Sequence, residues 1–152
     1  MHTQDVVLIL HNVRSRFNVG AIFRTADAAG VKKIYLCGIT PAPPHPKIDK
    51  VALGATAFVP FEKRPRTADV LKELNAKKYE LVALEQSKKS TPYFTRKKKF
   101  PLALIVGAEV RGLPDTLLKK CDVVIDIPMH GQKESLNVAI ALGIVLFDII
   151  QP

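Results

Sequence analysis

Three polar segments of the chain, residues 12–24, 106–114 and 127–137, each follow apolar residues and carry side chains that could act in chemistry. In the first, Asn18 is placed to cap a helix, and Arg24 lies about one and a half turns further along that helix. Arg24 could be a solvated residue paired with an aspartate at the i,i+3 spacing. Because its neighbours on this helix are mostly apolar, a functional role is the alternative.

The second and third segments are placed where ligands bind in α/β proteins. In 106–114, two glycines bracket Glu109 directly after a buried strand, at the sheet edge where ligands bind. Glu109 could instead only satisfy backbone donors in a turn. In 127–137, Ser135 is a natural helix N-cap, which leaves Asn137, a poor helix former, unexplained. The exposed amides of that helix start could bind a carboxylate or a phosphate.

Several common cofactor and metal motifs are absent. The chain has no Gly-x-Gly-x-x-Gly after its first strand, no Gly-x-x-x-x-Gly-Lys-Ser/Thr and no Gly-x-Ser-x-Gly. Cys37 and Cys121 lie in apolar runs and are expected in the core, and no Cys-x-x-Cys pair or Cys/His cluster indicates a metal. Any small-molecule site must therefore be built in another way.

Apolar runs alternate with helical patterns along the whole chain. Strands are expected at 6–10, 33–39, 57–61, 79–84, 102–106 and 123–127, and helices at 18–29, 47–53, 67–78, 114–120 and 135–150. Thr67 is expected to cap its helix, and Pro114 to take a first helical position. The pattern predicts an α/β fold with one parallel sheet and helices on both faces. No linker divides the chain, so we expect a single domain over 1–152.

The formal charge of +9 favours a polyanionic partner, through phosphate neutralisation and counterion release. Each basic cluster taken alone is more often a solvated surface. Within 87–100, however, aromatic residues interrupt the basic runs, which suits stacking on unpaired RNA bases. The candidate RNA-binding residues are Arg14, Arg16, Lys88, Lys89, Tyr93, Arg96, Lys97 and Lys98.

The last expected helix is apolar around nearly its whole circumference. A helix of this kind must be buried on all sides, and a homodimer is the simplest way to cover its outer face. Its apolar run, 138–150, is shorter than a membrane span. Residues 1–5 do not read as the start of a signal peptide. We therefore expect a cytoplasmic protein without a membrane segment.

Together the three segments resemble the three motifs of the TrmH (SpoU) family of the SPOUT superfamily of RNA methyltransferases. The motifs are 18–24 (NVGAIFR), 105–113 (IVGAEVRGL) and 127–129 (IPM) with 135–139 (SLNVA). The resemblance covers essentially the whole chain. It implies a carboxyl-terminal trefoil knot that forms a pocket for S-adenosylmethionine, and methyl transfer to a ribose 2′-hydroxyl of structured RNA.

The resemblance also implies roles for individual residues. Arg24 is the implied catalytic residue. Because its guanidinium is always protonated, it would act by orienting the hydroxyl and the phosphate. Asn18, Glu109, Ser135 and Asn137 would complete the catalytic set. The implied cofactor-binding residues are Leu84, Glu85, Gly107, Ile127, Met129, Ser135, Leu136, Asn137 and Val138.

Two other functions stay open at this point. One is a catalytically silent RNA-binding module with the same fold, and the other is a SPOUT enzyme that methylates a base. Transfer RNA and ribosomal RNA are both open as substrates, with a slight preference for transfer RNA. No separate RNA-binding extension is expected.

Overall fold

A single parallel sheet organises residues 5–152, the part of the chain that the computed structural model describes. Residues 1–4 lie outside the described residues. They make up most of the segment 1–5, for which the sequence predicts no signal peptide. The strand order is β3-β2-β1-β6-β4-β7-β5. The strands are β1 (Val6–His11), β2 (Lys33–Cys37), β3 (Phe61–Arg64), β4 (Glu80–Leu84), β5 (Thr91–Pro92), β6 (Leu102–Val106) and β7 (Val123–Asp126).

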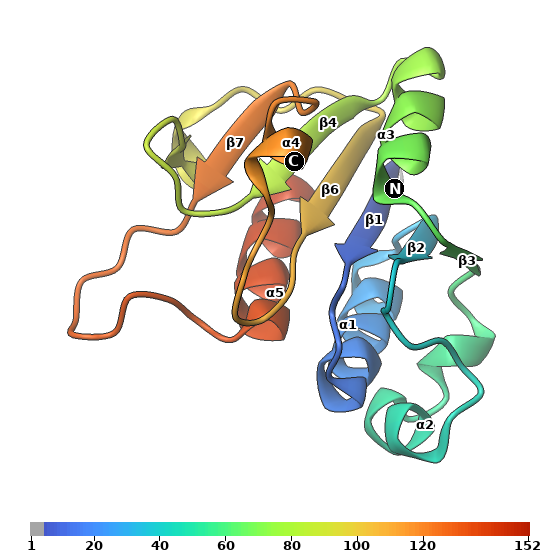
Figure 1. Cartoon of the computed structure of the whole chain (residues 1–152). Helices are drawn as coiled ribbons and strands as arrows, with labels where there is room; N and C mark the ends of the chain where they lie inside the picture. The colour runs from blue at the N-terminus through green and yellow to red at the C-terminus, as the bar shows by residue number, and fades with distance from the viewer. Residues whose placement is uncertain (1–4) are drawn as a thin grey trace.

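Five α-helices and two short 3₁₀ helices connect the described strands (Figure 1). They are α1 (Arg16–Ala29), α2 (Pro46–Ala52), η1 (Ala55–Ala57), α3 (Thr67–Ala76), η2 (Tyr93–Thr95), α4 (Asp115–Leu118) and α5 (Val138–Ile149). The predicted α/β class with a parallel sheet is confirmed.

The core has two layers, one on each face of the sheet. In β1, alternate residues Leu8 and Leu10 pack with residues of α1, α2 and α5, whereas Val7 and Ile9 pack with residues of α3 and α4. Successive side chains of a strand point to opposite faces, so a strand buried on both faces must be apolar at every position. The continuous apolar runs of β1 and β6 therefore arise from helices on both faces, as predicted.

The third strand lies later in the chain than the sequence predicts. Residues 55–57 form η1, which the Ala57 N–H closes by donating to the Gly54 carbonyl at 3.1 Å. The strand itself is β3, whose three charged residues after Phe61 suit the edge position that it occupies beside β2. The expected strand at 57–61 is wrong, because a turn motif occupies most of that range.

Helix starts also differ from the predictions. α1 begins at Arg16, and its cap is Ser15, whose Oγ accepts from the Asn18 N–H at 3.1 Å. Thr67 lies inside α3, where its hydroxyl hydrogen-bonds His11 Nδ1 at 2.6 Å. Pro114 precedes α4 as its N-cap residue. The predicted cap positions of Asn18 and Thr67 are therefore wrong.

The last helix begins three residues later than predicted. Asn137, not Ser135, is its cap, because Asn137 Oδ1 accepts from the backbone N–H groups of Ala139 at 2.8 Å and Ile140 at 3.2 Å. This is the structural reason for an asparagine at the head of an apolar helix. The long connection 127–137 leaves the sheet after β7 and returns to α5, which contacts α1 (Figure 1). The trefoil knot stays a prediction.

One side of α5 remains in solvent. Leu142, Val145 and Leu146 are fully buried, but Ile140, Ile144 and Phe147 are 57%, 40% and 39% exposed. These three lie at the i, i+4, i+7 spacing of one helix face. The described chain therefore leaves uncovered the outer face that the sequence predicts to be buried. None of the described helices is long and apolar enough to cross a membrane.

Candidate active site

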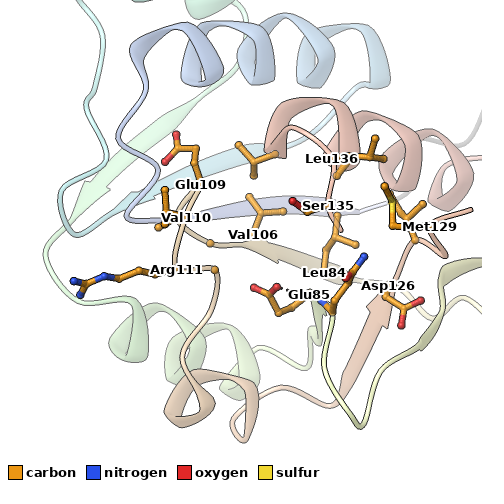
Figure 2. A pocket seen from close by; sticks show the side chains of 17 residues that line it. Leu84, Glu85, Val106, Glu109, Val110, Arg111, Asp126, Met129, Ser135 and Leu136 are labelled. Atoms are coloured by element: carbon orange, nitrogen blue, oxygen red, sulfur yellow. Dashed lines mark hydrogen bonds between the residues drawn. The ribbon is translucent and has the colours of Figure 1, made fainter. Parts of the chain in front are cut away.

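A cavity of about 190 Å³ lies across the carboxyl ends of β4, β6 and β7. The loops that follow these strands supply Glu85, Glu109 and Met129, and the start of α5 closes the cavity with Val138. Figure 2 shows Glu109, Val110 and Arg111 toward one end, and Asp126 and Met129 toward the other. This is the sheet edge at which parallel α/β proteins bind ligands.

A chain of hydrogen bonds joins the three motifs beside this cavity. Asn18 Nδ2 donates to Glu109 Oε1 at 3.2 Å, and Asn137 Nδ2 donates to Asn18 Oδ1 at 3.0 Å. Since Asn137 Oδ1 also caps α5, each amide oxygen and nitrogen in this chain has a partner. Asn18 is 5% exposed, and its two bonds fix the orientation of its amide. The three residues therefore brace the start of α1, the loop after β6 and the start of α5 against one another.

The Glu109 carboxylate is held by donors from the first motif. Its oxygens accept from the backbone N–H groups of Arg14 at 3.2 Å and Ser15 at 3.0 Å, besides the Asn18 amide. Burial alone would raise the pKa of Glu109, but the hydrogen bonds from the Ser15 and Glu109 backbones, the Asn18 amide and the Arg14 backbone outweigh it and lower the pKa. A carboxylate with a lowered pKa is a poor proton acceptor, so Glu109 is suited to positioning.

Two glycines let the second-motif loop fold against itself. A Cβ at Gly107 would lie 2.5 Å from the Gly112 carbonyl carbon, and one at Gly112 would lie 2.2 Å from Glu85 Oε2. Gly112 also has a φ of +64°, which side chains other than glycine's rarely adopt. Glu85 Oε2 accepts from the Leu113 N–H at 2.6 Å, so this carboxylate holds the loop at its far end.

The structure brings eight of the nine predicted cofactor-binding residues to the cavity. These are Leu84, Glu85, Gly107, Ile127, Met129, Ser135, Leu136 and Val138. Asn137 is the exception, because its side chain turns to Asn18 and to the start of α5. Its side chain is thus part of the hydrogen-bond chain, and its contact with the cofactor stays a prediction.

The predicted set omitted several residues that line the cavity. They are Gln86, Val106, Ala108, Val110, Arg111, Gly112, Asp126 and Ala141. Most are neighbours of the predicted residues in the same loops, so placing the loops at one edge would have found them. Asp126 is different, because it lies inside the strand predicted at 123–127 and is the last residue of β7, next to the edge strand β5. Its Oδ2 accepts from Ser90 Oγ at 2.5 Å, and only the fold shows that it lies at the cavity.

Arg24 lies apart from the other predicted catalytic residues. It is exposed on α1 and does not line the cavity. Among the ion pairs within residues 5–152, none joins Arg24 to Asp27, so the i,i+3 ion pair considered for Arg24 is not formed. Ser135 does line the cavity. The catalytic parts of both residues stay predictions.

The predicted RNA-binding residues separate into two groups. Arg96 forms an ion pair with Glu80 and its side chain is 13% exposed, and Lys98 Nζ donates to the Asp148 carbonyl in the last turn of α5 and to the Gln151 carbonyl just after it. Tyr93 packs against the core. These three therefore have partners within the described chain, and their contact with RNA stays a prediction. The others are exposed, namely Arg14, Arg16, Lys88, Lys89 and Lys97.

No group of three or more metal-ligating side chains is found within residues 5–152. The site is thus a glycine-lined cavity at the carboxyl edge of a parallel sheet, braced by amides and a carboxylate from distant motifs. This arrangement defines a ligand-binding α/β domain. The chain belongs to the SpoU rRNA Methylase family, whose model matches residues 5–147. The resemblance to the TrmH (SpoU) family is confirmed.

Relatives and solved structures agree with this placement. The chain is 34% identical over 150 residues to the 23S rRNA (guanosine-2′-O-)-methyltransferase RlmB of Vibrio parahaemolyticus, covering 99% of this chain and 60% of that protein. It is 35% identical to RlmB of Pasteurella multocida, over 98% of this chain and 61% of that protein. The chain therefore spans about three fifths of the length of these relatives. Their names do not support the expected preference for transfer RNA.

Among solved structures, the AdoMet-bound rRNA methyltransferase from Sinorhizobium meliloti superposes with a TM-score of 0.90 at 34% identity. That match covers 98% of this chain and 57% of the other. The TrmH/SpoU tRNA modifying enzyme of A. aeolicus superposes with a TM-score of 0.88 at 30% identity, covering 97% of this chain and 74% of the other.

Proposed function

We propose that this chain carries the catalytic site of an S-adenosylmethionine-dependent methyltransferase that acts on a ribose 2′-hydroxyl of RNA. The observation that carries the proposal is the hydrogen-bond chain from Glu109 through Asn18 to Asn137, which joins all three family motifs beside one cavity. The AdoMet bound in the Sinorhizobium relative and the 2′-O-methyltransferase names of the RlmB relatives support the reaction.

The chemistry of the cavity lining suits S-adenosylmethionine. Leu84, Ile127 and Met129 give an apolar wall for a purine ring, and the Gly107 backbone allows close approach of a ligand. The carboxylates of Glu85 and Asp126 line the same space. No ion pair engages either of them within the described chain, so both are available to a cationic ligand.

When bound, S-adenosylmethionine would supply a sulfonium methyl group for the ribose oxygen, leaving S-adenosylhomocysteine, with the hydroxyl proton released to water. The brace of Asn18, Glu109 and Asn137 fixes the walls of the site, which is the positioning that an in-line transfer needs. Arg24 would orient the ribose and its phosphate through its permanent charge. Ser135 would contact the ribose from the other side of the cavity.

Ribosomal RNA is the substrate class that we propose, in place of the transfer RNA first expected. The RlmB relatives named above act on 23S rRNA, and their identity to this chain extends over nearly its full length. The tRNA modifying enzyme from A. aeolicus has lower identity. Comparing the methylated nucleotides of ribosomal and transfer RNA between strains with and without the protein tests this choice, because the target nucleotide loses its methyl group in the strain without it.

A homodimer through α5 is part of the proposal. The exposed stripe of Ile140, Ile144 and Phe147 would be covered by the same stripe of a second copy, since a two-fold contact places like surfaces together. We also propose that 127–137 completes the trefoil knot of the family around the cavity. A single monomeric mass in analytical ultracentrifugation at micromolar concentration would argue against the dimer.

The decisive experiment for the function has two steps. Calorimetry with S-adenosylmethionine tests the cavity, and transfer of a radiolabelled methyl group to total RNA tests catalysis. Cofactor binding without transfer would favour the silent RNA-binding module. Nucleoside mass spectrometry of the product then separates a methylated ribose from a methylated base, and a methylated base would overturn the proposed acceptor.

A further inference from the structure

Two apolar side chains at one end of the cavity stay in solvent when the chain folds. Phe17, in the first turn of α1, is 62% exposed, and Val110, next to Glu109 in the loop after β6, is 96% exposed. An exposed phenyl ring leaves a large apolar area in water that binding could bury. Neither side chain belongs to the two core clusters.

The hydrogen bond between Asn18 and Glu109 brings the backbone segments that carry Phe17 and Val110 close together. Phe17 is bonded to Asn18 and Val110 is bonded to Glu109, whose side chains meet at 3.2 Å. Glu109 and Val110 both line the cavity, at the end where Figure 2 shows them with Arg111. Phe17, in the first turn of α1, and Val110, in the loop after β6, therefore lie on neighbouring segments at this end of the cavity.

Three arginines lie close in the sequence to these two apolar residues. Arg14 and Arg16 lie within three residues of Phe17, and Arg111 follows Val110 directly. All three are exposed, and none has an ion pair within residues 5–152. An aromatic face beside free guanidinium groups matches a nucleotide, because the base offers a π face and the flanking phosphates offer negative charge.

We propose that Phe17 is a stacking platform for an unpaired RNA base at the mouth of the cavity, with Val110 against the same nucleotide and the three arginines on its flanking phosphates. The proposal rests on the proposed function and specifies its substrate as an unpaired nucleotide. A base inside a helix has both faces covered by its neighbours, so it must leave the stack before it can lie on Phe17. The enzyme thereby selects loops, bulges or extruded nucleotides over regular duplex.

The alternative occupant is a second copy of this chain, because α1 lies beside α5 and its exposed stripe. The cluster of arginines favours RNA, since three like charges around an apolar pair would have to be desolvated in a protein contact. The oligomeric state of a Phe17 variant separates the two occupants.

The test uses the full chain and two hairpin RNAs that carry 2-aminopurine, one in the unpaired loop and one in the paired stem. Phe17→Ala should weaken binding of the loop-labelled hairpin about tenfold and remove most of the fluorescence quenching, because stacking on an aromatic side chain supplies that part of the affinity. Phe17→Trp should retain both. Affinity for S-adenosylmethionine by calorimetry should stay unchanged.

Phe58→Ala is the matched control, since Phe58 is 73% exposed at the end of η1, outside the cavity lining. Equal RNA binding by the two alanine variants would overturn the proposal. A change of molecular mass in Phe17→Ala would also overturn it and assign Phe17 to a protein contact. Methyl transfer by the unmodified chain is measured separately, so a failure of the proposed function appears there and not in the stacking assay.

Discussion

Replacing Asn18 by aspartate changes one donor into an acceptor at the centre of the brace, with almost no change in shape. Asn18 Nδ2 donates to Glu109 Oε1 at 3.2 Å, and that contact becomes one between two carboxylates. The bond from Asn137 Nδ2 to Asn18 Oδ1 can persist, because an aspartate oxygen accepts equally well. Asn18→Asp therefore isolates the link between the first and second motifs.

The expected destabilisation has two parts. The lost hydrogen bond is worth about 1 kcal/mol, a value near the lower end of the range because Glu109 is accessible to water. Repulsion between unit charges about 4 Å apart is between ~1 and ~4 kcal/mol for dielectric constants from bulk water to a protein surface. A total of about 2–5 kcal/mol lowers the melting temperature of a chain of this size on the order of 10 °C.

The penalty should depend on pH in a defined direction. Two adjacent carboxylates raise the pKa of the pair above its unfolded value, so the folded variant can keep a proton that the unfolded chain releases. The deficit relative to the unmodified protein should therefore be small near pH 4.5 and grow as the pH rises. At pH 7.5, affinity for S-adenosylmethionine should also fall, because Glu109 lines the cavity.

Thermal unfolding at the two pH values and calorimetry at pH 7.5 measure these effects. Asn75→Asp, at an exposed asparagine near the end of α3, is the control and should change the melting temperature by less than about 2 °C. Equal melting temperatures for Asn18→Asp and the unmodified protein at pH 7.5 would refute the role of the brace. A deficit independent of pH would refute its electrostatic part.

Three further variants test the catalytic set, the glycine loop and the buried histidine. Arg24→Ala should reduce methyl transfer at least a hundredfold while S-adenosylmethionine still binds, and retained turnover in the label-transfer assay would remove Arg24 from catalysis. Gly112→Ala should weaken S-adenosylmethionine binding about tenfold by calorimetry, because the new methyl group meets a carboxylate at a φ of +64°. Gly131→Ala, which meets no atom within 4 Å, should bind normally. Burial lowers the pKa of His11, so the folded state holds it neutral, and the free energy of unfolding should fall as the pH drops below about 6.5. His11→Gln should flatten that slope in denaturant titrations, and an unchanged slope would assign the pH dependence to other groups.

Local pattern was sufficient for most of the sheet. The continuous apolar runs of β1 and β6 predict strands covered on both faces, because only burial of both faces makes every position apolar. It was insufficient at residues 55–61, where the apolar run 57–61 predicts a strand but the chain forms η1 and a turn, and the polar edge strand β3 follows. It was also insufficient at helix starts, where two candidate caps stand within three residues and only the backbone path selects Ser15 over Asn18 and Asn137 over Ser135.

The basic loop shows the same limit for charge. Arg96 and Lys98 stand in a run of cations that predicts a free surface. Folding places Glu80 beside Arg96 and the carbonyls at the end of α5 beside Lys98. Whether a charge is free depends on residues far away in the chain, which the run itself does not contain.

The sequence by itself determined the fold class, the family and the three motifs that build the site, because apolar periodicity and motif order are properties of the chain. Only the tertiary structure decided what the motif residues do. Glu109 is 91 residues from Asn18, and Asn137 is 119 residues from it, so their hydrogen bonds exist only once the strands align their carboxyl ends at one edge. That alignment makes Asn18, Glu109 and Asn137 a brace around the cavity and leaves Arg24 and Phe17 exposed on α1.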